Sequence, residues 1–173
     1  MTQPRLKLAY DFWDYFLEVS GLIFLILLML WPTIHFSSLP EIIPTHFNGF
    51  GKADGFGSKA TVWTLPVIGL GLFIFLFFLN KYPHVFNYPV KITAENAKYQ
   101  YGLATKMMRM LNTVVIAMFF FIELILIESA KRGELVAGMN FIFMHVIVIF
   151  VSIGVYLYLS RKKDHPTPDA QEN

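Results

Sequence analysis

Four long apolar stretches constrain the fold of this 173-residue chain more than any other feature. The stretches are Val19–Ile34, Thr61–Asn80, Met110–Ile127 and Met139–Ser160. The first two contain no ionisable side chain, whereas the third contains only Glu123 and the fourth only His145. Each is close to the roughly 20 residues that an α-helix needs to cross the hydrocarbon core of a bilayer. The sequence therefore predicts four transmembrane helices.

The composition agrees with a membrane protein and excludes several other classes. Hydrophobic residues make up 55% of the chain and charged residues 15%, against roughly 45–50% and 25% in soluble domains. A β-barrel would alternate apolar and polar residues, whereas Gly21–Leu30 and Leu70–Leu79 are apolar on every side. The absence of cysteine excludes a disulfide-stapled secreted module. We expect an all-α integral membrane protein with an ordered extracytoplasmic loop between helices 1 and 2.

The distribution of basic residues predicts the orientation. Ten Lys and Arg lie in the N-terminal tail, the second loop and the C-terminal tail, and four lie in the first and third loops. Because basic residues resist translocation, both termini are expected in the cytoplasm, in a multi-pass protein of the cytoplasmic or inner membrane. Residues 1–18 are expected to form a cytoplasmic and interfacial segment. Residues 126–160 would form the third loop and helix 4, and residues 161–173 a disordered cytoplasmic tail.

The loop between the first two apolar stretches is rich in turn signals and aromatic residues. Asn48-Gly49 and Asp54-Gly55 are turn dipeptides, because glycine accepts positive φ and Asn or Asp bonds its own backbone. Phe47, Phe50 and Phe56 would be a liability if they were simply solvated. We therefore expect an ordered cap over the outer helix ends.

The loop string Pro44-Thr45-His46-Phe47-Asn48, followed by Gly51, Asp54 and Ser58-Lys59, resembles the signature of a bacterial membrane domain of unknown function. That domain also forms the N-terminal part of the SdpI-type immunity proteins. Residues 87–97, with Gln100-Tyr101, resemble a second block of such proteins. The resemblance implies an SdpI-related membrane domain over residues 15–125, comprising helices 1–3.

This resemblance implies a candidate loop site. Its residues are Pro44, His46, Asn48, Gly51, Asp54 and Lys59. One interpretation is that these side chains only stabilise turns and the membrane interface. The other is that His46, Asn48, Asp54 and Lys59 converge on a ligand, joined by His35 and Glu41. The spacing of His35, Glu41, His46 and Asp54 matches no closed zinc or calcium pattern, so we predict no metal or cofactor.

Glu123 and His145 are candidates for a pair inside the membrane. Each lies about five residues from the outer end of its apolar stretch, so antiparallel neighbouring helices would hold them at similar depth. Ionisable residues at membrane depth are costly unless they are paired or hydrated. The pair would be either a structural hydrogen bond or part of a proton-coupled path.

No motif of a hydrolase, metalloprotease, phosphate loop or dinucleotide site occurs in the chain. We expect a non-enzymatic sensor, immunity or accessory protein, embedded in the lipid bilayer and without nucleic-acid binding. Its outer loop would contact a peptide, a lipid or a membrane-protein partner. The alternatives are a small homo-oligomeric transporter that uses Glu123 and His145, and a membrane-embedded lipid-modifying enzyme.

Overall fold

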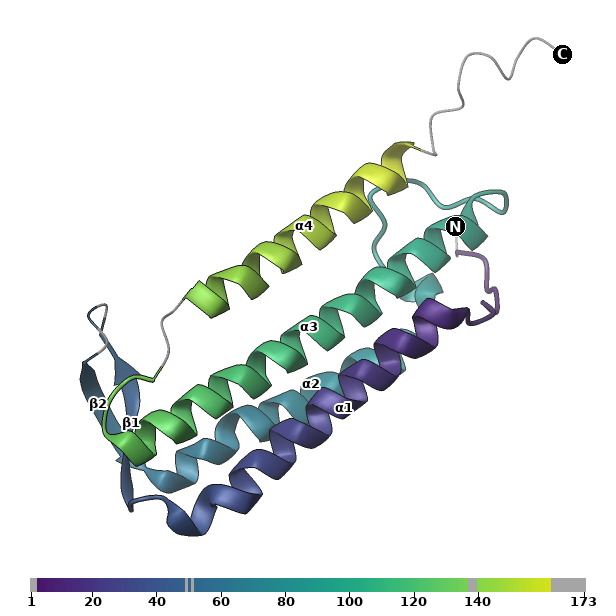
Figure 1. Ribbon diagram of the computed structural model, residues 1–173. Helices are drawn as coiled ribbons and strands as arrows, with labels where there is room; N and C mark the ends of the chain where they lie inside the picture. Colours follow the sequence, from purple (N-terminus) through teal and green to yellow (C-terminus); the bar gives the residue numbers. More distant parts are fainter. Residues whose placement is uncertain (1–2, 49, 51, 137–139, 163–173) are drawn as a thin grey trace, which may run out of the picture.

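The computed structural model describes residues 3–48, 50, 52–136 and 140–162, and it is mostly helical. Its main helices are α1 (Phe12–His35), α2 (Thr64–Leu79), α3 (Ala97–Arg132) and α4 (Asn140–Lys162), with short 3-10 turns at Phe36–Ser38, Lys59–Trp63 and Pro83–Val85. In Figure 1, α1, α2 and α3 form one group and α4 lies along α3. All four helices, α2 together with the turn before it, are long and apolar enough to span a membrane.

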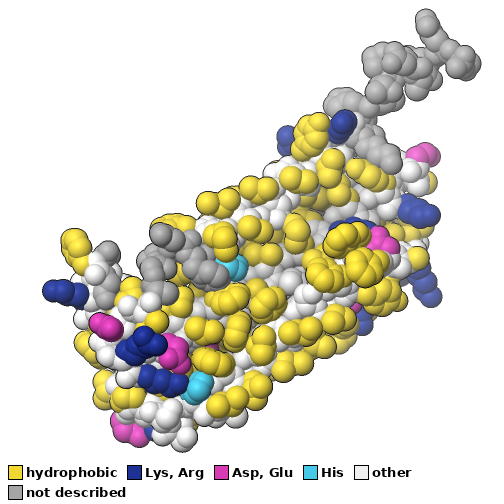
Figure 2. All heavy atoms as spheres, in the orientation of Figure 1, with side chains coloured by type: hydrophobic (Ala, Val, Ile, Leu, Met, Phe, Trp, Pro, Cys, Tyr) yellow, Lys and Arg dark blue, Asp and Glu magenta, His cyan; other side chains and the backbone are white. Residues whose placement is uncertain are grey.

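The polar residues gather at the two ends of the bundle. Figure 2 shows hydrophobic side chains over the middle of the visible face and charged side chains near its ends. We call the end with the N-terminus the tail end; there α1 and α3 begin and α2 and α4 end. The opposite end is called the hairpin end. This division is that of a membrane protein, with an apolar band between two polar surfaces.

The expectation of an all-α fold is wrong in one segment, because the loop after α1 forms a β-hairpin. Strand β1 (Ile42–Phe47) pairs antiparallel with β2 (Ala53–Ser58), and Ile42 lies opposite Ser58. The register shifts after Pro44, which has no N–H to donate to the ladder. The strands approach closely, since a Cβ on Gly55 would come within 3.0 Å of the Cβ of His46. Glycine therefore permits the pairing.

The hairpin is anchored to α3 by buried apolar residues. Ile43 is fully buried in a cluster with Leu39, Val62, Ile127 and Ala130. Burying a side chain of this size stabilises the fold by roughly 1.5–3 kcal/mol. Strand β1 thus contributes Ile43 to the core, whereas the exposed side of β2 lies outside the core.

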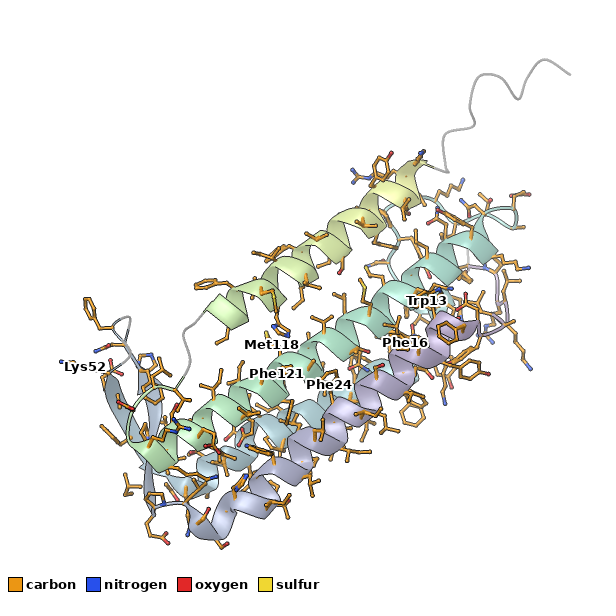
Figure 3. All side chains as sticks on the ribbon, viewed as in Figure 1. Trp13, Phe16, Phe24, Lys52, Met118 and Phe121 are labelled. Atoms are coloured by element: carbon orange, nitrogen blue, oxygen red, sulfur yellow. The ribbon has the colours of Figure 1, made fainter. Side chains whose placement is uncertain are left out.

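A second apolar cluster joins α1, α2 and α3 near mid-length. It contains Leu25, Leu28, Ile116 and Phe120. Leu28 is fully buried, and a Cβ on Gly69 would lie 2.7 Å from its Cδ2 atom. Figure 3 shows Phe24 of α1 and Phe121 of α3 side by side, with ring centroids 6.1 Å apart. Close packing by small residues and aromatic rings holds these three helices together.

Candidate functional site

The hairpin brings two of the six candidate loop residues into contact. His46 Nδ1 and Asp54 Oδ1 lie 2.5 Å apart, across the two strands. Their side chains remain 71% and 45% exposed. Asp54, Phe56 and Ser58 alternate along β2 and are all exposed. A hydrogen-bonded pair of polar side chains and an aromatic ring therefore share one open surface, which we call the hairpin face: Ile42, His46, Asp54, Phe56 and Ser58.

The remaining loop candidates have local structural roles. The Asn48 side chain accepts hydrogen bonds from the backbone N–H groups of Phe50 and Lys52, at 2.9 and 3.1 Å, and so closes the turn. Lys59 forms an ion pair of 2.8 Å with Glu41. Pro44 is buried within β1. Gly51 lies outside the described residues. The described candidates therefore do not converge on one point.

The four residues weighed as metal ligands are held by different partners. The Lys131 ammonium lies 3.1 Å from His35 Nδ1, and the His35 ring packs on Trp31. Glu41 is paired with Lys59, and His46 with Asp54. Within the described ranges, no three carboxylate or imidazole groups are grouped as metal ligands would be.

The expected hydrogen bond between Glu123 and His145 is not formed. Glu123 is fully buried, and its carboxylate accepts no hydrogen bond from any described residue. It lies on the α3 face that carries Phe120, in the cluster with α1 and α2, and Ile127, in the cluster with the hairpin. The His145 ring instead contacts Phe121, at 6.0 Å between centroids. The two residues face different neighbours because positions 121 and 123 point to different sides of a helix.

His145 also lines a cavity of about 270 Å³ between α1, α3 and α4. The other lining residues include Phe24, Thr113, Ala117 and Met144. These residues are mostly apolar. The cavity therefore offers no continuous polar path toward the Glu123 carboxylate.

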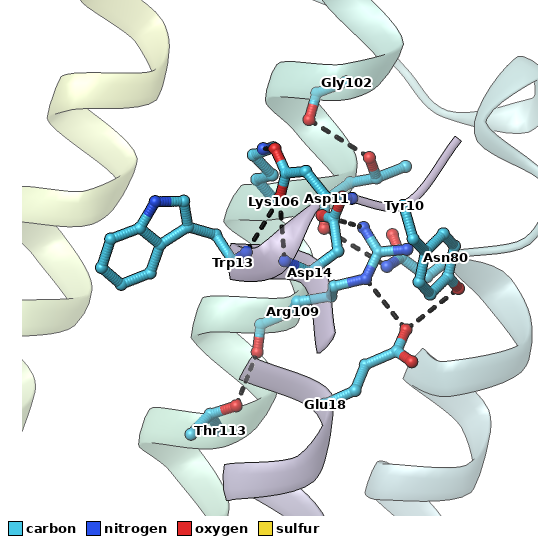
Figure 4. A network of polar contacts seen from close by, with 11 residues as sticks. Tyr10, Asp11, Trp13, Asp14, Glu18, Asn80, Gly102, Lys106, Arg109 and Thr113 are labelled. Carbon is cyan, nitrogen blue, oxygen red and sulfur yellow. Dashed lines mark hydrogen bonds and ion pairs between the residues drawn. The ribbon is translucent and has the colours of Figure 1, made fainter. Parts of the chain in front are cut away.

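An ion network at the tail end was missed by the sequence analysis. Arg109 of α3 donates from Nη1 to Asp14, at 3.0 Å, and from Nε to Glu18, at 2.9 Å. The side chains of Arg109 and Asp14 are only 6% exposed. Tyr10 donates its hydroxyl to Glu18, and its ring lies 4.4 Å from the guanidinium (Figure 4). Two carboxylates and a ring thus surround one buried cation.

Asp11 connects this network to the start of α1. Its carboxylate accepts from the backbone N–H groups of Trp13 and Asp14, and the Asp14 carboxylate accepts from the Asp11 N–H, which completes a capping box. Lys106 also donates to Asp11 (Figure 4). The bond from Lys106 first, and then the one from the Asp14 backbone, lower the pKa of Asp11 below its usual value. Asp11 therefore stays ionised near neutral pH.

The sequence carried a signal for this network. Asp11, Asp14 and Glu18 have the i, i+3 and i+7 spacing of one helical face, and Lys106 and Arg109 have a matching i, i+3 spacing. In the sequence alone, Lys106 and Arg109 served only to predict the orientation in the membrane. Because complementary charges at helical spacing predict helix pairing, the two sets together indicate that α1 packs on α3.

Comparisons with known proteins give a family but no activity. Residues 22–70 match a family described as "Domain of unknown function (DUF1648)", which covers most of α1, the hairpin and the first part of α2. An uncharacterised protein of Archaeoglobus fulgidus is 31% identical over 158 residues, covering 81% of this chain and 84% of that protein. No solved structure matches the chain. The chain therefore belongs to the family of this uncharacterised archaeal protein and contains a domain of unknown function.

Proposed function

We propose that this is a non-enzymatic accessory protein of the membrane whose hairpin face binds a peptide or a membrane-protein partner. The observation that carries the proposal is the open pair of His46 and Asp54 beside the exposed Phe56 ring. An exposed apolar side chain rimmed by polar groups is typical of an interaction surface. The hairpin face is held in a fixed position, because the buried Ile43 packs against residues of α3.

The orientation of the basic residues supports a hairpin outside the cytoplasm. The tail end collects the N-terminal tail, the second loop and the end of α4, which are the segments richest in Lys and Arg. In this arrangement both termini are cytoplasmic. The resemblance of the loop string to that of SdpI-type immunity proteins supports a role in immunity or sensing at the outer surface.

The test is a strain that lacks the protein, challenged with toxic peptides and envelope stresses and complemented with variants. We expect the double variant His46→Ala and Asp54→Ala, which leaves the Asn48 turn in place, to lose complementation while it accumulates to the wild-type level. The matched control replaces Arg132 and Glu134 with alanine; both are exposed, at the same end and outside the hairpin. Full complementation by the double variant would refute the proposal.

A small oligomeric transporter that uses Glu123 and His145 is the second candidate. It is favoured by the buried carboxylate of Glu123 in a membrane-spanning helix, which has no hydrogen-bond partner among the described residues. The test is collapse of a pH gradient in proteoliposomes of the purified protein. Transport would be lost in Glu123→Gln and kept in Glu128→Gln, whose parent side chain is paired with Lys131. Liposomes that hold their gradient with wild-type protein would exclude this function.

A further inference from the structure

A polar cavity at the tail end is separate from the hairpin face. Its volume is about 230 Å³, and its walls come from the N-terminal segment, the end of α2 and the face of α3. The polar residues that line it are Lys7, Tyr10, Asn80, Lys81, Thr105 and Arg109. The N-terminal wall is held in place by Tyr101, which donates its hydroxyl to the Pro4 carbonyl at 2.9 Å. The cavity is therefore part of the folded structure.

The lining carries two positive charges that no carboxylate of the described residues neutralises. Lys7, Lys81 and Arg109 come from three different segments, and no acidic residue is among the described residues of the lining. The charge of Arg109 is balanced by Asp14 and Glu18. Lys7 and Lys81 form no ion pair with any described residue, although Lys81 lies over the rings of Phe77 and Phe78. Two cations thus remain available to an anion.

Asn80 fixes one wall of the cavity. It is 5% exposed, and its side-chain amide donates to the Thr105 carbonyl at 3.2 Å, which ties the end of α2 to α3. Its Oδ1 atom is buried and accepts no hydrogen bond from a described residue, so it lies behind the cavity surface and does not recognise a ligand. The groups that can recognise one are the two lysines, and the ligand chemistry is therefore that of an anion.

The position of the cavity indicates that a lipid supplies this ligand. Aromatic side chains that mark the headgroup level lie at the same end, where Trp13 and Phe16 are exposed on α1 (Figure 3). Cavities for drug-sized ligands measure about 300–1,000 Å³. The smaller volume here suits a headgroup whose acyl chains remain in the bilayer. Basic pockets between transmembrane helices recognise lipid headgroups in this way.

We propose that this cavity binds the headgroup of an anionic phospholipid, with Lys7 and Lys81 on the phosphate. Phosphatidylglycerol has this chemistry, because its phosphate carries one negative charge. Phosphatidylcholine has the same phosphate but carries no net charge, because its choline cation cancels the phosphate.

The test is a titration of these lipids into the full-length protein in detergent micelles, with bound lipid counted by native mass spectrometry. The wild type is expected to prefer phosphatidylglycerol to phosphatidylcholine. Replacing Lys7 and Lys81 with alanine is expected to weaken phosphatidylglycerol binding about 30-fold, equivalent to about 2 kcal/mol. Because both lysines are exposed, the core is left intact.

The matched control replaces Lys91 and Lys98, two exposed lysines of the second-loop region outside this cavity. An equal loss in the control, or no loss in either variant, would overturn the proposal, because the lysines would then act only through general charge. Equal binding of phosphatidylglycerol and phosphatidylcholine by the wild type would also overturn the proposal. Inorganic phosphate separates the two sources of the anion: binding of phosphate by the lipid-free protein, with no preference between the two lipids, would overturn the assignment to a lipid and point to a soluble anion.

Discussion

The two ends of the bundle differ in how deeply their side-chain pairs are buried. At the hairpin end, His46 and Asp54 are paired in the open. At the tail end, Arg109 is buried against Asp14. An exposed pair adds little stability, because solvent screens it, whereas a buried pair must stay complete. The comparison teaches that the buried pair at the tail end holds helices together, whereas the pair at the hairpin end is left open to solvent.

The largest effect is expected from Arg109→Gln, which tests whether the tail-end pair supports the fold. The change leaves the Asp14 carboxylate buried beside Glu18 without its cation. Breaking a buried pair in this way costs about 3–5 kcal/mol. Thermal unfolding in detergent, followed by circular dichroism, measures the loss. A cost below about 1 kcal/mol, the range of exposed pairs, would erase the contrast between the two ends.

The next effect tests what fixes the hairpin to the bundle. Ile43→Ala empties a fully buried position and is expected to cost about 2–5 kcal/mol. Ile42→Ala, next to it on the exposed side, is the matched control and should change stability by less than about 0.5 kcal/mol. Equal effects of the two substitutions would mean that β1 is not anchored through Ile43.

A smaller effect, dependent on pH, is expected from Asp11→Asn. Asparagine keeps the helix cap but loses the ion pair with Lys106. Because the pKa of Asp11 is lowered in the folded protein, its charge stabilises the fold above the usual value of 3.8. That contribution disappears as the pH falls through the lowered pKa. The difference in melting temperature between wild type and variant should therefore be largest near neutral pH and shrink below about pH 4. A difference in melting temperature that stays constant with pH would show that asparagine is a weaker helix cap than aspartate and that the charge of Asp11 adds no stability.

The smallest effect on stability is expected from His46→Ala. The exposed pair with Asp54 contributes about 0–1 kcal/mol, so the melting temperature should hardly move. Complementation, in contrast, should fall if the hairpin face binds a partner. A loss of stability as large as that of Arg109→Gln would show that His46 has a structural role and that the hairpin end also depends on its pair for stability.

The four helices could be predicted from sequence because each apolar run is long enough to specify its own structure. The hairpin could not, since Gly55 and Gly57 disfavour strands in isolation. The pairing depends on contacts distant in sequence, such as the cluster of Ile43 with Ile127. A two-stranded hairpin is marginal in water without such support.

The candidate sites were predictable to a lesser degree. The contact between His46 and Asp54 follows from a turn at Asn48, which the sequence indicated. The pairing of Arg109 with Asp14 joins residues far apart in sequence and depends on which helices are neighbours. For Glu123, depth along the bundle could be inferred but the direction of its side chain could not.

Helix α3 is one continuous rod of 36 residues, without an internal proline. At about 1.5 Å per residue it is roughly 54 Å long, well beyond the ~30 Å hydrocarbon core. It carries Ile127, which packs in one cluster with Ile43 of the hairpin, and Arg109 and Thr105, which line the tail-end cavity. A rigid tilt of one degree moves one end of such a rod by roughly 1 Å relative to the other. The hairpin and the tail-end cavity therefore lie at opposite ends of one rigid helix, so that any tilt of α3 displaces the two relative to each other.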